Sequence, residues 1–527
     1  MISTVLENAE IIDGSGGKPY VADIGIVGDR IALIGDLRER ASAGRIDCTG
    51  QTVTPGFIDV HSHSDELWLA LPGCDGKIAQ GVTTEIGGNC GMSAAPLRGP
   101  GLERVRRSAE HVGLPVEWRD FDEFFALVER NGIALNVASL VGLGTARQAV
   151  TGDSEKRLDR AELEAQSALV REACEQGAVG ASSGLAYPPS SYADIDELAA
   201  MAAAARDGGA ARYASHIRNE SEHLLEATAE ALEVGRRAGV LVQCSHHKAA
   251  GKRNWGAVHR SLAAISQARA AGVEAYADVY PYVASWTELA TILPPEARYG
   301  GIEATLQRLR EPTDAAVVAA YLEATRGDEW HDILITDVAS EGNVALAGMR
   351  LDEIAAMWGV EPARAAITLL IDERLDVGAA YFRMSEDDVA AVLSAAFCCV
   401  GSDASVRALS GPTARGVPHP RTFGTFPRVL ARFVRERKTL PWAEAIRRMT
   451  SLPASIFGLD GRGSIGVGSF ADLVVFDAEK IGDAATYERP YAFPTGIAHV
   501  YVNGEAVLRE GALTSKRPGR VLRNRAH

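Results

Sequence analysis

Two histidines in the stretch PGFIDVHSHSD, His61 and His63, are separated by one residue and follow directly on an apolar run. In a continuing strand, residues two apart point to the same face, so both imidazoles can reach one ion. Zinc binds imidazole nitrogen, thiolate sulfur and carboxylate oxygen. Short histidine motifs of this kind also occur in surface turns, so the pair indicates a metal site only if further ligands follow along the chain.

Side chains of the same chemistry stand at the ends of later apolar segments. Cys90 lies in TTEIGGNCGMS, His216 ends ARYASH, and His246 ends VLVQCSH. The glycines around Cys90 predict a tight loop whose backbone approaches another segment closely. Taken singly, a cysteine is more often an inert buried thiol, and each histidine a hydrogen-bonded structural residue. At the ends of successive predicted strands, however, they together indicate a metal site.

A carboxylate follows the last of these apolar segments. Asp403 lies in CCVGSDAS, where it is either a turn or N-cap residue or a base beside a metal site. Lys248 and Tyr280, in SHHK and DVYPY, also stand just past predicted strands. The sequence thus places imidazole, thiolate, carboxylate and ammonium groups at equivalent positions.

Strands and helices in alternation are expected to position these groups. From about residue 52 to 410, short apolar strands are separated by Ala/Leu/Glu-rich segments such as SEHLLEATAEALEVGRRAG, which has apolar residues at helical spacing and a terminal glycine. The alternation predicts parallel strands in an α/β fold, most simply a (β/α)8 barrel, with a doubly wound sheet as the alternative. In such barrels the chemistry lies at the strand ends, where the candidate residues stand.

Both ends of the chain instead read as short strands with turns. The first 50 residues show apolar runs separated by Gly and Asp, and the last 65 contain VNGE, a strong Asn-Gly hairpin signal. The segment near 288–345, beginning ATILPPEARYGG, interrupts the alternation and is a possible insertion over the site.

Composition limits the classes of partner. A net charge of −15 argues against broad nucleic-acid or anionic-membrane binding, so an anionic substrate needs a local cationic receptor. No run of about 18 apolar residues is present, and the N-terminus does not read as a secretory signal. Seven cysteines in 527 residues indicate reduced thiols and a cytoplasmic location. The expected partner is a small molecule; the oligomeric state is not predicted.

Eight stretches, in order over nearly the whole chain, resemble the amidohydrolase superfamily and, more narrowly, the D-aminoacylase (N-acyl-D-amino-acid deacylase) family. They are TPGFIDVHSHSD, GVTTEIGGNCG, YASHIRNES, SHHKAAG, DVYPY, GSDAS, HPRTFGTFPRVL and GVGSFADLVVFD. The resemblance implies a (β/α)8 TIM-like barrel over 55–459, and a small β-sandwich domain formed from both chain termini, 1–54 and 460–527.

The resemblance also implies zinc. A tight site would be built by Cys90, His216 and His246, and a second, weaker site by His61, His63 and Cys90. Many relatives place a carboxylated lysine between two metals, and here Cys90 would replace it. A thiolate is a soft ligand that holds zinc well, so the second position is expected to be only partly occupied.

The implied activity is zinc-dependent hydrolysis of the amide bond of N-acyl-D-amino acids, releasing a carboxylate and a free D-amino acid. Asp403 would take a proton from water and deliver it to the leaving amine. Arg421 in HPR and Tyr280 would hold the substrate carboxylate, with Lys248 near the substrate. One departure is Trp286, because relatives carry a small Ser/Thr pair shortly after YPY.

The residues allow three other interpretations. A cyclic amidase of the dihydropyrimidinase (hydantoinase) type on the same barrel usually needs the lysine bridge, which GNCG replaces. A serine hydrolase would use Ser182 in GASSG, but that motif must open a helix, and Pro188 and Pro189 follow it. A catalytically silent relative acting as a binding protein is disfavoured, because every proposed ligand and Asp403 are present.

Overall fold

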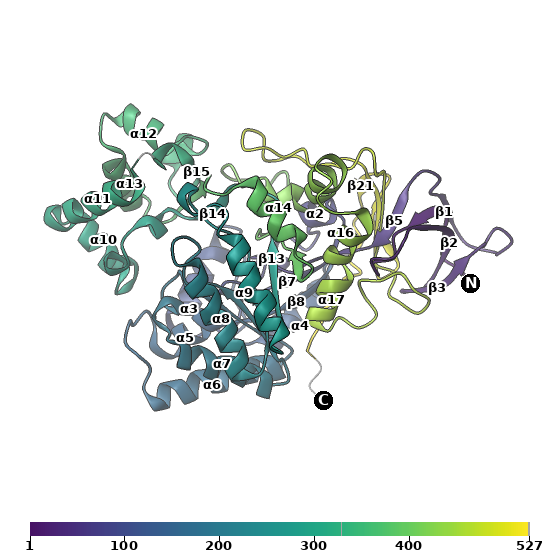
Figure 1. Cartoon of the computed structure of the whole chain (residues 1–527), viewed down its shortest axis with the longest axis horizontal. Helices are drawn as coiled ribbons and strands as arrows, with labels where there is room; N and C mark the ends of the chain where they lie inside the picture. The colour runs from purple at the N-terminus through teal and green to yellow at the C-terminus, as the bar shows by residue number, and fades with distance from the viewer. Residues whose placement is uncertain (328, 525–527) are drawn as a thin grey trace.

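The computed structural model describes residues 1–327 and 329–524. The chain has a mixed α/β architecture with three regions along its long axis (Figure 1). A central α/β body lies between a β-rich region that carries the N-terminus and a helical lobe at the opposite end.

Two sheets of parallel strands form the centre of the α/β body. One sheet has the order β6 (Phe57–Asp59), β7 (Val82–Gly87), β8 (Asn136–Ser139). The other has the order β17 (Cys398–Val400), β13 (Ala275–Val279), β12 (Leu241–Cys244), β11 (Arg212–His216), β10 (Ala181–Gly184), β9 (Val141–Gly142). The predicted alternation of parallel strands and helices is therefore confirmed.

The edges of the two sheets meet at two places. Only Leu140 separates β8 from β9, so the chain passes almost directly from one sheet to the other. Ser62, just past β6, pairs in parallel with Ala404, just past β17. The carboxyl ends of β6 and β17 therefore lie side by side. The Ser402 hydroxyl, just past β17, donates to the carbonyl of His61, just past β6, although 341 positions separate the two residues in the sequence.

Amphipathic helices cover the strands, and α6 to α9 lie next to one another (Figure 1). The segment predicted to be helical from its apolar spacing forms α8 and ends at Gly239, whose φ of +65° is the left-handed conformation that favours glycine. The helices of the body are α1 (Leu67–Ala70), α2 (Asp75–Ile78), α3 (Gly99–Glu110), α4 (Phe121–Asn131), α5 (Leu143–Thr151), α6 (Arg160–Glu175), α7 (Ile195–Asp207), α8 (Leu224–Ala238), α9 (Val258–Ala270), α14 (Glu386–Ser394), α15 (Arg421–Arg428), α16 (Trp442–Met449) and α17 (Ser451–Phe457).

Strands from both chain ends pair in one nine-stranded sheet. The two ends join where β5 runs antiparallel to β18. The VNGE hairpin is confirmed: Asn503 and Gly504 connect β19 to β20, and both have positive φ, as a type I′ turn requires. The strands are β1 (Thr4–Ile11), β2 (Tyr20–Val27), β3 (Arg30–Gly35), β4 (Arg45–Asp47), β5 (Thr52–Pro55), β18 (Leu473–Phe476), β19 (Ile497–Val502), β20 (Glu505–Arg509) and β21 (Ala512–Leu513). The last three residues of the range 460–527 lie outside the described residues.

The helical lobe follows β13 and has a hydrophobic core of its own, which includes Leu309, Leu322 and Leu370. A small antiparallel sheet of order β14–β16–β15 connects it to the body. The lobe and this small sheet consist of β14 (Ser285–Glu288), α10 (Gly301–Arg310), α11 (Pro312–Arg326), β15 (Ile333–Val338), α12 (Leu351–Trp358), α13 (Pro362–Asp372) and β16 (Val377–Tyr381).

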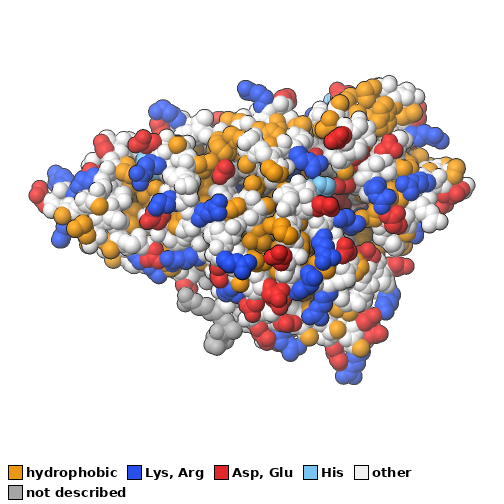
Figure 2. Space-filling model, turned by 180° about the vertical axis from the view of Figure 1, so that it is seen from behind, with side chains coloured by type: hydrophobic (Ala, Val, Ile, Leu, Met, Phe, Trp, Pro, Cys, Tyr) orange, Lys and Arg blue, Asp and Glu red, His pale blue; other side chains and the backbone are white. Residues whose placement is uncertain are grey.

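Among the described residues, no single helix has both the length and the apolar composition to cross a membrane. Helices α12 and α13 meet these two criteria only when they are counted together, and the pair is bent by 92°. On the face drawn in Figure 2, acidic and basic side chains are interspersed over the whole surface.

Candidate metal and catalytic centre

The candidate residues lie just past the carboxyl ends of the parallel strands. His61 and His63 follow β6, and the others follow later strands in the order Cys90 after β7, His216 at the end of β11, His246 after β12, Tyr280 after β13 and Asp403 after β17. Cys90, His246 and Asp403 have φ values of +52°, +34° and +52°. This left-handed conformation costs a non-glycine residue about 1–2 kcal/mol, so the surrounding structure must hold these three residues in place.

The loop that carries Cys90 packs directly against neighbouring backbone. Gly88 has a φ of +71°, and a Cβ atom there would lie 1.9 Å from the carbonyl oxygen of Leu140. A Cβ on Gly91, with φ of +75°, would lie 2.7 Å from the amide nitrogen of Gly184. The tight loop predicted from the glycines around Cys90 is therefore confirmed.

Ser182 supports this loop through hydrogen bonds to its backbone. Its hydroxyl donates to the carbonyl of Gly88 and accepts from the amide of Gly91 at 3.0 Å. A nucleophilic serine needs a general base, and the hydrogen bonds of Ser182 within the described residues go to backbone instead. The segment after β10 also turns into a short 3-10 helix at Ser190–Tyr192 rather than opening an α-helix directly. These contacts give no support to the serine-hydrolase interpretation.

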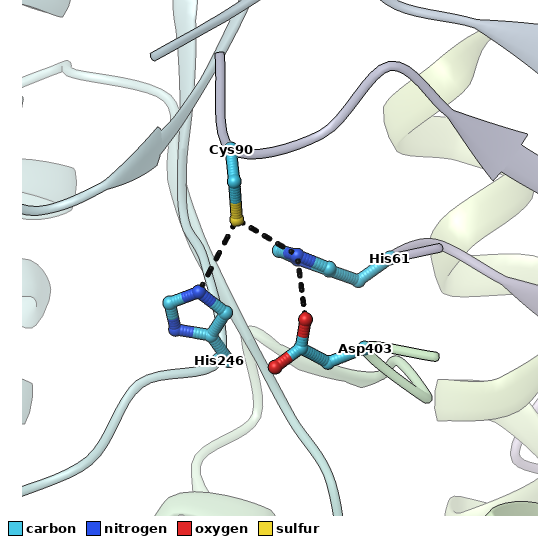
Figure 3. Close-up of side chains that lie close together, drawn as sticks. All are labelled: His61, Cys90, His246 and Asp403. Atoms are coloured by element: carbon cyan, nitrogen blue, oxygen red, sulfur yellow. Dashed lines mark hydrogen bonds and ion pairs between the residues drawn. The ribbon is translucent and has the colours of Figure 1, made fainter. Parts of the chain in front are cut away.

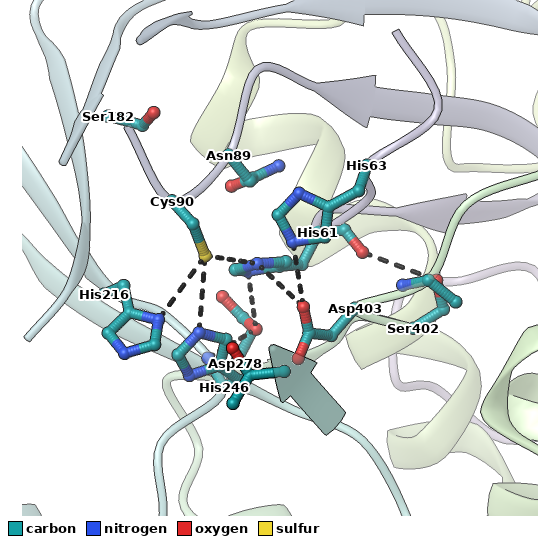
Figure 4. A network of polar contacts seen from close by, with 12 residues as sticks. His61, His63, Asn89, Cys90, Ser182, His216, His246, Asp278, Ser402 and Asp403 are labelled. Carbon is teal, nitrogen blue, oxygen red and sulfur yellow. Dashed lines mark hydrogen bonds and ion pairs between the residues drawn. The ribbon is translucent and has the colours of Figure 1, made fainter. Parts of the chain in front are cut away.

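The Cys90 sulfur is surrounded by three imidazoles (Figures 3 and 4). Its Sγ lies 3.3 Å from His61 Nε2, 3.5 Å from His246 Nε2 and 3.6 Å from His216 Nδ1. A tetrahedral zinc with Zn–S of about 2.3 Å and Zn–N of about 2.0–2.1 Å separates sulfur from nitrogen by about 3.5 Å. All four side chains are buried. The donor types and their spacing around the Cys90 sulfur thus fit zinc.

Two carboxylates orient the imidazoles from behind. Glu220 Oε1 lies 2.9 Å from His246 Nδ1, and Asp278 Oδ1 lies 3.3 Å from His61 Nδ1. Asp278 also accepts the backbone N–H of His246 at 2.8 Å. A carboxylate that accepts a hydrogen bond from Nδ1–H favours the tautomer whose Nε2 lone pair is free to bind a metal, and the Nε2 atoms of His61 and His246 face Cys90.

Sequence reasoning missed Glu220 and Asp278. Both lie inside motifs that carry the family resemblance, Glu220 in YASHIRNES and Asp278 as the first residue of DVYPY. A signal for Asp278 existed, because it stands two residues before Tyr280 in a strand and so shares its face. Glu220 lies in a loop, where no periodicity indicates direction.

Asp403 lies between the imidazoles and a guanidinium. Its Oδ1 is 3.0 Å from His63 Nε2 and 3.5 Å from His61 Nε2, and its Oδ2 is 2.8 Å from an Nη of Arg421. Burial raises the pKa of the Asp403 carboxyl, but Arg421 and His246 outweigh burial and hold it well below its usual value. Asp403 is therefore an ionised carboxylate that can accept a proton.

The pKa of Cys90 distinguishes it from the other six cysteines, all of which are also unpaired. Burial raises the pKa of every one of them; that of Cys174, for example, rises to about 12. Burial acts on Cys90 as well, but His61 and His246 outweigh it and place its pKa well below the ordinary value. Cys90 is thus the cysteine whose surroundings favour the thiolate, which is the metal-binding form.

The residues expected to contact substrate gather around the Tyr280 ring. The guanidinium carbon of Arg421 lies 4.7 Å from the ring centroid, and Lys248 Nζ lies 5.6 Å from it. The Tyr280 hydroxyl is buried without a hydrogen-bond partner among the described residues. Lys248 Nζ contacts Glu220 Oε1 at 2.5 Å and lies 2.7 Å from His246 Nδ1, so its ammonium lies beside the contact between Glu220 and His246.

The two residues that follow YPYVAS point in different directions. Trp286 donates its indole N–H to Thr336 Oγ1 of β15 at 2.7 Å, so its polar edge faces the lobe. Thr287 Oγ1 lies 3.0 Å from the hydroxyl of Tyr187, whose ring packs edge-on against His216 at 4.9 Å between centroids. Tyr187, which sequence reasoning also missed, is therefore the aromatic residue that borders the cluster on this side.

Comparisons with known proteins agree over the whole chain. The sequence model of the amidohydrolase family matches residues 45–508. N-acyl-D-glutamate deacylase of Alcaligenes xylosoxydans xylosoxydans is 39% identical over 525 residues, which cover 100% of this chain and 97% of that protein. The crystal structure of N-acyl-D-glutamate deacylase from Bordetella bronchiseptica, complexed with zinc and a phosphonate mimic of the tetrahedral intermediate, superposes with a TM-score of 0.85 at 36% identity, covering 99% of both chains.

A structure of D-aminoacylase, described as having a binuclear metal centre with one-metal activation and second-metal attenuation, gives a TM-score of 0.84 at 34% identity over 99% of this chain and 100% of that one. D-hydantoinase (dihydropyrimidinase) from Thermus sp. gives a TM-score of only 0.57 at 18% identity, over 99% of this chain and 98% of that one. That likeness is one of fold alone and gives no support to a cyclic amidase.

The Cys90 loop allows a matched test of backbone packing. Gly88→Ala should destabilise the protein by about 1–3 kcal/mol more than Gly113→Ala, because both positions are left-handed but only Gly88 also lacks room for a Cβ atom. Thermal melting of both variants checks this. Equal melting temperatures would contradict the close approach at Leu140.

If Cys90 is a zinc ligand, removing its thiol should weaken metal binding. Cys90→Ala is expected to weaken zinc binding by more than about 100-fold, since a ligand matters at least as much as the groups that orient it. Cys244→Ala, at an equally buried cysteine at the end of β12, is the control and should retain zinc. Metal analysis after dialysis against a mild chelator provides the measurement, and zinc retained by the Cys90 variant would contradict a ligand role for Cys90.

Proposed function

The chain belongs to the amidohydrolase family, and on that premise we propose that it is a zinc-dependent N-acyl-D-amino-acid deacylase. It hydrolyses the amide bond of an N-acyl-D-amino acid and releases a carboxylate and the free D-amino acid. The main observation in support of this function is that three imidazoles surround the buried Cys90 thiolate and that Asp403 lies beside them. Relatives that share the full chain and act, by their names, on N-acyl-D-amino acids support the substrate class.

We assign the tight zinc position to Cys90, His216 and His246. Glu220 supports this choice, because it orients His246 from 2.9 Å. The second position would use His61, His63 and Cys90. His63 has a quarter of its side chain exposed and pairs with Asp403, which makes the second position the weaker one.

The chemistry divides between the metal and Asp403. When bound, zinc supplies a Lewis acid that polarises the amide carbonyl and lowers the pKa of water. Asp403 accepts a proton from the water whose oxygen adds to the acyl carbon. The same carboxyl then delivers that proton to the amide nitrogen as the C–N bond breaks and the amine leaves. Its contact with His63 and its ion pair with Arg421 keep the carboxylate ionised for the first step.

Arg421, Tyr280 and Lys248 form the proposed receptor for the substrate α-carboxylate. A guanidinium has five N–H donors, and the contact with Asp403 engages only one Nη of Arg421, so the remaining donors can meet a carboxylate. The buried, unpartnered hydroxyl of Tyr280 needs an acceptor, and a carboxylate oxygen would provide one. Lys248 adds positive charge beside the same ring.

For the fold, we propose that the two parallel sheets are parts of one (β/α)8 TIM-like barrel, with β8 and β9 as one interrupted strand. The Ser62–Ala404 pairing that brings β6 beside β17 supports closure. We propose that both termini form a small β-sandwich domain, because residues of β1, β2, β18 and β19 share one core cluster. The lobe at 285–381 is then an insertion into the barrel.

We propose a cytoplasmic location, supported by seven cysteines that are all unpaired. The interspersed charges in Figure 2 give no support to a nucleic-acid surface on that face.

A substrate panel tests the function directly. N-acetyl-D- and N-acetyl-L-amino acids should be assayed for free amine alongside metal analysis, with turnover expected for D substrates only. Asp403→Asn should lower kcat by about 10²–10⁴-fold while zinc remains bound, because the amide has the same shape but cannot take up the proton. Turnover of cyclic amides alone, or full activity of the variant, would refute the proposal.

The carboxylate receptor has its own test. Arg421→Lys should raise the KM for the preferred substrate by about tenfold or more, since lysine keeps the charge but loses the bidentate geometry. Arg428→Lys is the matched control on the same helix, where the guanidinium packs over Tyr282 and pairs with Asp483 instead. An unchanged KM in the Arg421 variant would show that the anchor lies elsewhere.

A further inference from the structure

Lys77 is a fully buried lysine that no step of the proposed reaction uses. It lies on α2, and its ammonium has four oxygen neighbours. Nζ is 2.6 Å from Asp59 Oδ2, 2.9 Å from Glu85 Oε1, 2.8 Å from Ser402 Oγ and 2.9 Å from the carbonyl of Ala404. The last two residues flank Asp403 on either side.

The carboxylates around Lys77 extend this contact to the histidine-bearing strand end. Asp59 is the last residue of β6, and its Oδ1 accepts the backbone N–H of Ser402 at 2.8 Å and lies 3.3 Å from that of His61. Glu85 on β7 accepts from the hydroxyl of Ser64 at 2.6 Å. One ammonium therefore holds together the segments 59–64 and 402–406.

Direct hydrogen bonds between the two segments complete the arrangement. The N–H of Asp403 donates to the carbonyl of His61 at 2.8 Å, and Ser405 Oγ donates to the carbonyl of His63 at 2.7 Å. Figure 4 shows the result, with Asp403 facing both imidazoles. Because Asp403 itself has a left-handed backbone, its orientation depends on neighbours that hold Ser402 and Ala404.

We propose that Lys77 is a positioning residue that fixes the Asp403 carboxylate opposite His61 and His63, and that the efficiency of proton transfer in the proposed deacylation depends on it. The inference rests on the proposed function. A buried ion pair adds little net stability compared with apolar residues of the same volume. A lysine whose partners are the two site segments is better explained by the geometry that it imposes on them.

A second buried ion pair provides the control. Arg147 on α5 is equally buried and pairs with Glu197 on α7, and it also donates to the carbonyl of Lys156 at 2.6 Å. None of these groups belongs to the proposed catalytic machinery. Arg147→Met and Lys77→Met thus remove the same kind of interaction, one away from Asp403 and one beside it.

The test compares four zinc-loaded proteins, with kcat expressed per bound zinc: wild type, Lys77→Met, Ser402→Ala and Arg147→Met. Ser402→Ala removes one contact of Lys77 without leaving a charge unpaired, so it keeps the test valid if Lys77→Met does not fold. Both variants at the site are expected to lower kcat per zinc, by about tenfold or more in Lys77→Met, with KM changed less than about threefold. As the pH is lowered, the kcat of both variants should also begin to fall at a higher pH than the kcat of wild type. A displaced Asp403 loses cationic neighbours, so the pKa of its carboxyl rises, and the carboxylate that must accept the proton is lost sooner.

Arg147→Met should lower the melting temperature without changing kcat per zinc or its pH profile. The inference is overturned if Ser402→Ala and any folded Lys77→Met keep the wild-type kcat per zinc and pH profile, or if Arg147→Met alters both in the same way. Wild-type turnover of N-acyl-D-amino acids, measured first in the same assay, separates the two proposals. An inactive wild type contradicts the proposed function, whereas an active wild type with unaltered variants contradicts only the role of Lys77.

Discussion

The rest of the site depends on a single cysteine sulfur that lies within 3.6 Å of three imidazole nitrogens. Cys90 must be fully buried to reach them, and burial alone would raise its pKa and make it a poor ligand. His61 and His246 reverse that effect and hold the pKa of the Cys90 thiol well below its ordinary value. Metal binding by Cys90 therefore depends on every group that fixes the position of this sulfur. This includes the glycines of its loop, the hydroxyl of Ser182 and the left-handed backbone of Cys90 itself.

The sequence predicted well those features that local rules determine. Strands and helices follow from apolar spacing, the Asn503–Gly504 turn follows from the need for positive φ, and the tight Cys90 loop follows from its glycines. The candidate ligands could be named because each one directly follows an apolar strand, and the structure brings them together at one end of the parallel sheets.

Long-range contacts could not be predicted in the same way. Lys77 reads as an ordinary surface lysine in CDGKIAQG, and only the tertiary structure places its ammonium against Ser402, more than 300 residues away. Glu220 acts on His246 from a loop, where side-chain direction has no period. The direction of Trp286 depends on pairing between β14 and β16, which the sequence does not specify. The direction of each of these side chains depends on contacts between distant segments, which exist only in the folded chain.

The contact between Arg421 and Asp403 links substrate binding to the ionisation of the base. In the proposed mechanism the same guanidinium holds Asp403 Oδ2 at 2.8 Å and receives the substrate carboxylate. Binding a second anion weakens the stabilisation that Arg421 gives to Asp403, so the pKa of the carboxyl rises as the substrate arrives. A free carboxylate with a very low pKa is a weak base, and this rise brings it closer to the value at which it can both accept and return a proton. With a net charge of −15, the protein would repel the proposed anionic substrate at long range, so that substrate needs a local cationic receptor. In the proposed mechanism the buried cations Arg421 and Lys248 therefore act in two ways. They offset the global charge for the substrate, and each also holds a group of the site, Asp403 and Glu220 respectively, in place.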